Sequence, residues 1–229
     1  MTKSANEKKE MMISFINATK RIIDEEGIEN VTARKVANLT GYNVATSYKY
    51  FNNLNHIIFF ASMKYYNKYI HDLPNYINEN YSSLRNYYEI WRCYCIHAFK
   101  DPKIFKSIFL DQGPHSIYNT MKQYYELFPN EFQDLPEVLS NMLNKDCFID
   151  RDIEILKYCA NDGYINMEDV EQISVNIVLF FEGLLVKVTN RIEGYDNEKA
   201  LEMMMDYVKS SLHYYTLKAK NLIPPFSEF

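Results

Sequence analysis

Glycine and proline are scarce in this sequence, with 6 glycines and 7 prolines among 229 residues, about half the share of an average protein. This scarcity argues against a turn-rich β-sandwich and against a glycine-rich phosphate-binding loop. The four cysteines include no pair in CxxC spacing, which is typical of a reduced intracellular protein. The lack of helix breakers favours an all-α fold.

Targeting and membrane-spanning segments are not apparent either. The first ten residues, MTKSANEKKE, are polar and lack the apolar stretch of a secretory signal. The most apolar segment, residues 173–188, is interrupted by Asn176, Glu182 and Lys187, so we expect a buried helix there. We therefore expect a cytoplasmic protein that does not bind a membrane.

Catalytic and metal-binding patterns are also missing. The sequence has no Ser/His/Asp spacing and no paired carboxylates in an apolar setting, so it is not expected to be an enzyme. Cys93 and His97 share a helical face, but Cys95 points away and two ligands do not complete a tetrahedral site. We expect core cysteines, no metal and no cofactor.

Helix starts and stops are marked clearly in the first seventy residues. An apolar stripe with 3-4 spacing predicts a first helix that ends at Gly27. Thr32 and Asn43 are placed to cap the next two helices, and Gly41 separates these helices. The expected spans are 33–40, 44–51 and, for a longer fourth helix, 54–73. Two short helices joined at a glycine form a helix-turn-helix pattern.

The segment from Thr32 to Phe51, TARKVANLTGYNVATSYKYF, resembles the DNA-binding head of the tetracycline-repressor (TetR) family. Thr-x-Arg-x-Val-Ala, Gly and Thr-x-Tyr-x-Tyr-Phe, in that order after Gly27, carry the resemblance. It implies an all-α protein whose N-terminal three-helix helix-turn-helix head is joined by a long helix to a C-terminal helical ligand-binding and dimerisation domain. We expect a DNA-binding domain at 1–53 and an effector-binding and dimerisation domain at 54–229.

The resemblance also implies which residues contact DNA. Thr32 and Arg34 would contact phosphates at the start of their helix, and Tyr48 would donate its hydroxyl to a phosphate. The third helix would enter the major groove. The DNA-binding residues expected are Thr32, Arg34, Asn43, Val44, Thr46, Ser47, Tyr48, Lys49 and Tyr50. The alternative for Tyr48 and Tyr50 is surface packing in a Tyr-rich protein. Val36, Ala37, Leu39 and Phe51 are expected to form the core of the head.

Three positions depart from the family's pattern. Leu54 stands where a lysine is common, Ser47 where leucine is usual, and Val44 where a polar residue often occurs. A lost cation removes one phosphate contact per subunit and so weakens DNA binding or its salt dependence. Apolar residues on a DNA-binding face can also contact a protein, so the alternative function is that of a TetR-like adaptor or coactivator that binds a protein instead of DNA.

Charge is divided unevenly along the chain. Residues 1–70 hold ten Lys and Arg against six acidic residues, a net charge of +4. The other 159 residues hold 15 against 24, a net charge of -9, which gives the whole-chain value of -5. A basic head on an acidic body is the asymmetry that a DNA-binding protein needs.

Aromatic side chains gather in the middle of the sequence. Trp91, Tyr94 and His97 follow one another by steps of three, and Tyr87 lies four residues before Trp91. The ligand-binding residues expected are Tyr87, Trp91, Tyr94, His97 and Tyr118. They would suit a planar, apolar or cationic compound. For each of these residues, ordinary core packing is the alternative to ligand binding. For the protein as a whole, a small helical enzyme with an aromatic pocket remains an alternative function.

Two long helices are expected at the end of the chain, over residues 167–191 and 197–219. The first is apolar over more than one stripe, so it needs both its own core and a second chain. The expected dimer residues are Ile173, Ile177, Phe180, Leu184, Val188, Leu201, Met205, Val208 and Leu212. The sequence therefore predicts a ligand-responsive repressor that binds a palindromic operator in double-stranded DNA as a homodimer and is released by a small-molecule effector.

Overall fold

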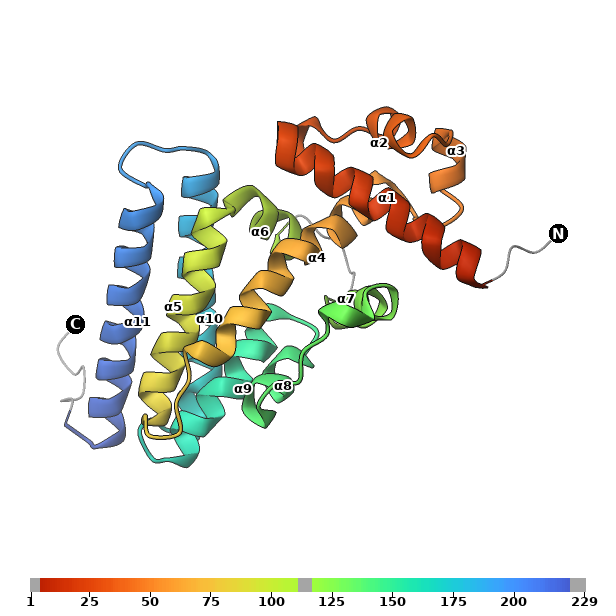
Figure 1. Cartoon of the computed structure of the whole chain (residues 1–229). Helices are drawn as coiled ribbons and strands as arrows, with labels where there is room; N and C mark the ends of the chain where they lie inside the picture. Colours follow the sequence, from red (N-terminus) through yellow and green to blue (C-terminus); the bar gives the residue numbers. More distant parts are fainter. Residues whose placement is uncertain (1–4, 111–116, 223–229) are drawn as a thin grey trace. The chain divides into compact units, whose positions relative to one another are not determined.

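The computed structural model describes residues 5–110 and 117–222, and Figure 1 shows their helices in chain order. Within these residues the chain is helical and contains no strand, as the sequence predicts. The α-helices are α1 (Ala5–Glu26), α2 (Ala33–Thr40), α3 (Val44–Ser47), α4 (Leu54–Asp72), α5 (Ser83–Lys100), α6 (Pro102–Phe109), α7 (Ile117–Leu127), α8 (Glu137–Leu143), α9 (Phe148–Asn161), α10 (Val170–Thr189) and α11 (Asn197–Ala219). Short 3-10 helices are η1 (Ile28–Asn30), η2 (Leu73–Asn75), η3 (Pro129–Glu131) and η4 (Met167–Asp169).

The described residues form two compact units. The first combines the chain up to residue 68 with residues 103–133, and the second combines residues 69–102 with the chain from residue 134 onwards. Helix α4 contributes residues 54–68 to the first unit and its last turn to the second. These units are defined by packing. The expected boundary between a DNA-binding domain at 1–53 and an effector-binding and dimerisation domain at 54–229 concerns function, and it stays a prediction.

Capping residues mark where α2 and α3 begin, and glycines mark where α1 and α2 end. Gly27, at φ 92°, follows the last residue of α1, and Gly41, at φ 72°, ends α2 in the left-handed region that glycine adopts without strain. A shared core holds the three helices together. Phe15 of α1 lies against the edge of the Phe51 ring, with ring centroids 6.3 Å apart, and both side chains are buried.

Leu39 does not belong to that core, contrary to expectation. Val36 and Ala37 are buried, but Leu39 is 45% exposed. At 100° per residue, Leu39 lies about 110° from the middle of the face formed by Val36 and Ala37, whereas Thr40 falls within that face. The hydroxyl of Thr40 donates to the carbonyl oxygens of Val36 and Ala37, so a polar side chain closes the helix there.

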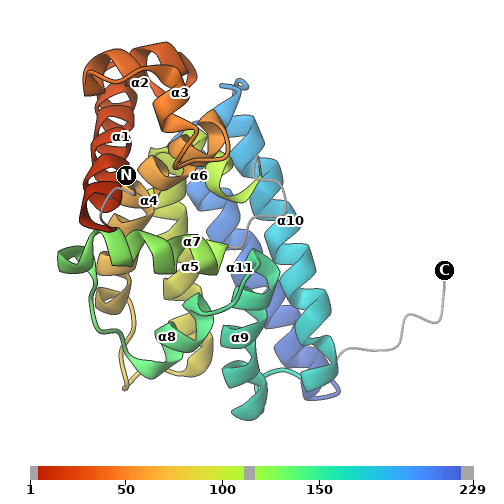
Figure 2. The ribbon, with the colours of Figure 1, turned by 90° about the vertical axis from the view of Figure 1, so that its right-hand side faces the viewer.

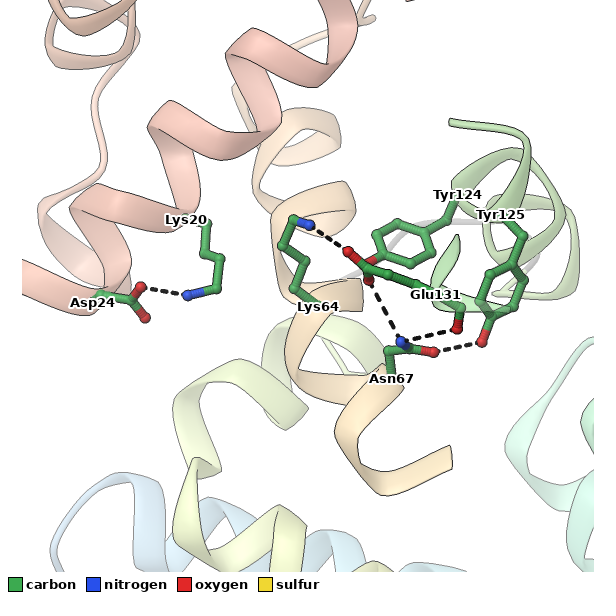
Figure 3. A network of polar contacts seen from close by, with 7 residues as sticks. All are labelled: Lys20, Asp24, Lys64, Asn67, Tyr124, Tyr125 and Glu131. Atoms are coloured by element: carbon green, nitrogen blue, oxygen red, sulfur yellow. Dashed lines mark hydrogen bonds and ion pairs between the residues drawn. The ribbon is translucent and has the colours of Figure 1, made fainter. Parts of the chain in front are cut away.

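A polar network joins the middle of α4 to η3 and α7 within the first unit (Figure 3). Lys64 Nζ forms an ion pair with Glu131 Oε1 at 2.8 Å, and Tyr124 donates its hydroxyl to the same carboxylate. Asn67 donates to the backbone oxygen of Glu131 at 3.4 Å and accepts from the hydroxyl of Tyr125 at 2.6 Å. Because Lys64 is mostly buried, its partner Glu131 is needed to stabilise the charge.

The second unit is a bundle in which α5 packs against α9, α10 and α11. Figures 1 and 2 both show α5, α10 and α11 running side by side. The segment Met167–Thr189 is long and apolar enough to cross a membrane by length and composition, but a bundle's core helix passes the same test. Its packing against α5, α9 and α11 agrees with the buried helix expected from the sequence.

Candidate functional site

Helix α2 begins with a side-chain cap and an exposed cation. Thr32 Oγ1 accepts the backbone N–H of Lys35 at 3.2 Å, as its position in the sequence predicts. Arg34, in the first turn, is exposed and forms no ion pair with the residues that the structure describes. Its neighbour Lys35 is paired with Glu26 at 2.5 Å. Arg34 is therefore the cation of α2 that remains available to an anionic partner.

Helix α3 is capped by Asn43, again as predicted. The side-chain oxygen of Asn43 accepts the backbone N–H of Thr46 at 2.9 Å and its hydroxyl at 3.0 Å. The helix spans only Val44–Ser47, shorter than the expected 44–51, because the chain then continues through turns. In these turns the N–H of Lys49 donates to Thr46 O and that of Tyr50 to Ser47 O.

The side chains from Asn43 to Tyr50 differ in their exposure. Tyr48 is 48% exposed and Lys49 is exposed, with no ion pair to any residue in the described ranges. Ser47 is buried and its Oγ donates to the carbonyl oxygen of Val44 at 2.7 Å, so its side chain faces the head's own core. The remaining expected DNA contacts are exposed at Asn43 and half-buried at Val44, Thr46 and Tyr50.

A cluster of buried aromatic rings lies in the second unit between α5, α9 and α10. The ring of Tyr94 is centred 4.8 Å from that of Phe148 and 5.1 Å from that of Phe181, and Trp91 lies 5.7 Å from Phe181. Of these rings only Phe148, in the first turn of α9, keeps an intermediate solvent exposure. Tyr87, Trp91 and Tyr94 of the expected ligand-binding set are thus together on the buried face of α5.

A buried carboxylate stands at the edge of this cluster. Trp91 donates its indole Nε1–H to Asp152 Oδ1 at 2.8 Å, while Asp152 Oδ2 has no hydrogen-bond partner among the described residues. Burial raises the pKa of Asp152 to about 6, and the nearby polar groups of Ser174, Tyr87 and Trp91 lower it in part. Tyr87 Oη is buried and likewise without a hydrogen bond in the described structure, and burial raises its pKa well above the ordinary value.

Several solved structures have an architecture similar to that of this chain. FadR of Thermus thermophilus, a TetR-family repressor in complex with lauroyl-CoA, is 12% identical and has a TM-score of 0.57 over 87% of this chain and 94% of that one. RolR in complex with resorcinol is 13% identical, with a TM-score of 0.57 over 97% and 100% of the two chains. The regulator of fatty acid degradation FadR from Bacillus halodurans is 14% identical, with a TM-score of 0.53 over 91% and 96%.

This chain has the fold of the TetR-family regulators. The likeness extends over most of the chain, so it includes both compact units as well as the helix-turn-helix segment. No family model and no curated protein sequence matches the chain. At 12–14% identity the three structures share the TetR fold with this chain, and the chemistry of its sites must be argued from its own residues.

Of the other two expected ligand-binding residues, His97 belongs to the second unit and Tyr118 to the first. His97 is near the C-terminal end of α5, where its Nε2 is 3.0 Å from Oδ2 of Asp72. Tyr118 belongs to α7 in the first unit and is half-buried. The expected set is therefore divided, with Tyr87, Trp91 and Tyr94 on the buried face of α5, His97 beside Asp72 and Tyr118 on α7.

Asp152 and Asp72 were not among the residues expected from the sequence. Asp152 shares the buried face of α9 with Ile155, Leu156 and Cys159, so a carboxylate inside an apolar 3-4-7 stripe is a signal that could have found it. Asp72 gives no such signal. It ends α4, and its partner His97 is 25 residues further along the chain on another helix.

The expected dimer residues are mostly inside the second unit. Ile173, Ile177, Leu184, Val188, Met205, Val208 and Leu212 are buried in the chain's own core, and Phe180 and Leu201 are half-buried. The apolar side chains that α10 leaves at the surface are Leu179, which is 58% exposed, and Val186. Phe180 stacks on Tyr207 of α11 with ring centroids 4.1 Å apart. Phe180 and Val175 are half-buried, so Leu179 and Val186 are the exposed apolar residues of α10.

Proposed function

We propose that this chain is a transcriptional regulator that binds operator DNA through its N-terminal head and responds to a small-molecule effector. The observation that carries the proposal is the exposure of Arg34 on α2 and of Tyr48 and Lys49 in the turns after α3, in a TetR fold, with both cations free of ion pairs to the described residues. Cations in this state are available to neutralise DNA phosphates. The function is one of binding, without catalysis, in the cytoplasm.

The head is proposed to contact DNA at two places. Thr32 and Arg34 at the start of α2 contact phosphates, which set the orientation of the head. Asn43, Lys49 and the half-buried side chains between them approach base edges in the major groove. Tyr48 donates its hydroxyl to a phosphate oxygen. Ser47 supports this surface from inside the head, through its bond to the carbonyl oxygen of Val44.

The operator is proposed to be palindromic, because the regulator acts as a homodimer. The exposed apolar side chains Leu179 and Val186 on α10, with Phe180 between them, supply the surface for a second copy. A two-fold dimer presents two heads, which read half-sites about one helical turn apart. In this proposal the unliganded dimer represses transcription by occupying the operator.

The effector is proposed to bind at the ring cluster beside Asp152. A planar compound that carries an ammonium or another hydrogen-bond donor would stack on Tyr94 and Phe148 and donate to Asp152 Oδ2. The hydroxyl of Tyr87 adds a second polar group without a hydrogen bond to the described residues. FadR and RolR were solved with lauroyl-CoA and resorcinol, two unlike molecules, so the class of compound follows from this chain's residues alone.

The two sites are connected through α4, which runs continuously from Leu54, directly after the head, to Asp72 in the second unit. Effector binding that favours another position of this helix would change the spacing of the two heads. A coupling of about 1–3 kcal/mol, typical of allosteric proteins, changes DNA affinity roughly 5- to 150-fold. A modest shift is therefore enough to release the operator.

Selection from sheared genomic DNA tests the proposed function. The purified full-length chain should enrich fragments that contain an inverted repeat, and the enriched fragment should shift in a native gel with wild type. The shift should weaken for Arg34→Ala and Tyr48→Ala, and persist for Arg92→Ala and Tyr158→Ala, which replace exposed side chains of the second unit. Recovery of a protein from lysate with no enriched DNA would instead favour an adaptor or coactivator and contradict the proposal.

A further inference from the structure

Three potential metal ligands from two helices meet in the second unit. Asp72 ends α4, while Cys93 and His97 lie one turn apart on the same face of α5. Their ligand atoms, a carboxylate oxygen, Sγ and an imidazole nitrogen, all lie within 4.8 Å of one another. We propose that Asp72, Cys93 and His97 form a binding site for one divalent metal ion of the zinc class, with a fourth position for water or another ligand.

The spacing of the three atoms suits tetrahedral coordination. Metal–ligand bonds of about 2.0–2.3 Å place neighbouring ligand atoms of a tetrahedral zinc site roughly 3.3–3.7 Å apart. Asp72 Oδ2 and His97 Nε2 are already 3.0 Å apart. All pairs of ligand atoms lie within 4.8 Å, so side-chain rotations that close the widest pair by about 1 Å bring the three atoms to tetrahedral spacing.

The ligand types select the metal. A thiolate, an imidazole and a carboxylate together favour zinc and similar transition metals, whereas magnesium and calcium prefer oxygen ligands alone. Hydrogen bonding from His97 lowers the pKa of Asp72, so an anionic ligand is already present. Burial and the charge of Asp72 raise the pKa of Cys93, which keeps the thiol neutral without a metal. A bound cation reverses that preference, and the thiol proton leaves to solvent on coordination.

Neighbouring groups hold the ligands in place and leave access from solvent. Asn75 Nδ2 donates to Asp72 Oδ1 at 3.2 Å, which leaves Oδ2 directed at His97. The ring of Tyr69 packs against the His97 imidazole with centroids 6.0 Å apart. Such outer contacts orient metal ligands and raise affinity. The side chains of Asp72 and His97 are 39% and 20% exposed, so an ion can enter and keep a water ligand.

The cysteines elsewhere in the chain provide matched controls. Cys95 is two residues from Cys93 on α5 and is buried, and Cys147 is exposed at the start of α9. Among the described residues no second group of three His, Cys, Asp or Glu side chains comes together in this way. Metal bound at the proposed site should therefore depend on Cys93 and on neither of the other two.

Cobalt(II) titration of the reduced, chelator-treated full-length chain tests the site. We expect one cobalt ion per chain, ligand-field bands of tetrahedral intensity and a near-ultraviolet thiolate-to-cobalt charge-transfer band, all bleached by one equivalent of zinc. Cys93→Ser should abolish the charge-transfer band, and Cys95→Ser and Cys147→Ser should keep it. Absence of the band in wild type, or its survival in Cys93→Ser, would overturn the proposal.

Variants of the partly exposed ligands give an answer that does not depend on altering the buried thiol. Asp72→Asn and His97→Gln, checked for an unchanged far-ultraviolet circular dichroism spectrum, should each weaken cobalt binding at least about tenfold. Asp72→Asn should keep the charge-transfer band, because Cys93 still binds. If Cys93→Ser fails to fold, these two variants decide, and wild-type affinity in both would contradict a site built from the three residues.

Discussion

Trp91 of α5 donates its indole N–H to Oδ1 of Asp152 of α9 over 2.8 Å, with both side chains buried. The bond satisfies one carboxylate oxygen and leaves the other, Oδ2, without a hydrogen bond to the described residues. An incompletely satisfied carboxylate in a core is costly to stability. Such costs are common where a protein binds a ligand, so the pair has consequences that can be measured both in stability and in effector recognition.

The first prediction concerns the charge of Asp152. Its pKa is about 6 in the folded chain and about 3.9 in an unfolded one, so the folded state binds the proton more tightly. The contribution of this group to stability therefore falls as pH rises from about 4 to about 6, by roughly 3 kcal/mol in all. Asp152→Asn removes the charge, so its stability relative to wild type should rise over the same range and then stay constant.

Denaturant unfolding between pH 4 and pH 8 measures that difference. Asp134→Asn, which neutralises an exposed carboxylate in the segment before α8, is the control and should show no comparable rise. If the difference in unfolding free energy between Asp152→Asn and wild type does not change with pH, ionisation of the buried carboxylate does not destabilise the fold.

The second prediction concerns the bond itself. Trp91→Phe keeps a ring in the cluster but removes the indole N–H that donates to Asp152 Oδ1, and should destabilise the chain by about 1–3 kcal/mol at neutral pH. The loss should be smaller in an Asp152→Asn background, because the partner is then uncharged. A double-mutant cycle by urea unfolding gives the coupling, which should exceed about 0.5 kcal/mol. Strictly additive effects of the two substitutions would argue against a stabilising interaction between Trp91 and Asp152.

The third prediction separates folding from DNA binding at Asn43. Asn43→Ala removes the cap of α3 and should cost about 1 kcal/mol of stability. Asn43→Asp keeps a capping oxygen, so thermal unfolding should show recovered stability. The added negative charge should still weaken binding to DNA phosphates, measured by fluorescence anisotropy on the selected fragment. Wild-type affinity in Asn43→Asp would place Asn43 away from the DNA.

The fourth prediction concerns the surface of α10. Leu179→Glu places a charge among the exposed apolar residues, so it should convert the proposed dimer to a monomer in light scattering at micromolar concentration. Operator binding should fall with it, since two heads no longer act together. Phe132→Glu, at an exposed aromatic of the first unit, should stay dimeric. A wild type that is already monomeric contradicts the proposed dimer.

Local features of the sequence were sufficient to predict much of the fold. Thr32 and Asn43 cap their helices as expected, and α11 spans Asn197–Ala219 as expected. These features depend on residues within one or two turns, so the sequence contains all the information needed. Helical periodicity also identified the buried residues of α10 and α11.

Periodicity does not say what a buried face packs against. The sequence predicts that Ile173 and Val208 face a second chain, but both side chains are buried in the core of the chain's own bundle. Pairs of residues far apart in the sequence cannot be predicted in this way, because no local pattern indicates that Asp72 contacts His97 or that Asp152 contacts Trp91. Ser47 was assigned to DNA from its place in the motif, while its burial depends on how the head is packed.

The most direct test of the account is a salt titration of DNA binding by the full-length chain. Anisotropy should give tighter binding to the selected fragment than to random duplex of equal length. The slope of log affinity against log salt is negative, and Arg34→Ala should make it less steep by about 0.9 per subunit, for one lost phosphate contact each, while Arg92→Ala leaves it unchanged. Equal affinity for both duplexes, or an unchanged slope in Arg34→Ala, would contradict DNA recognition by this head.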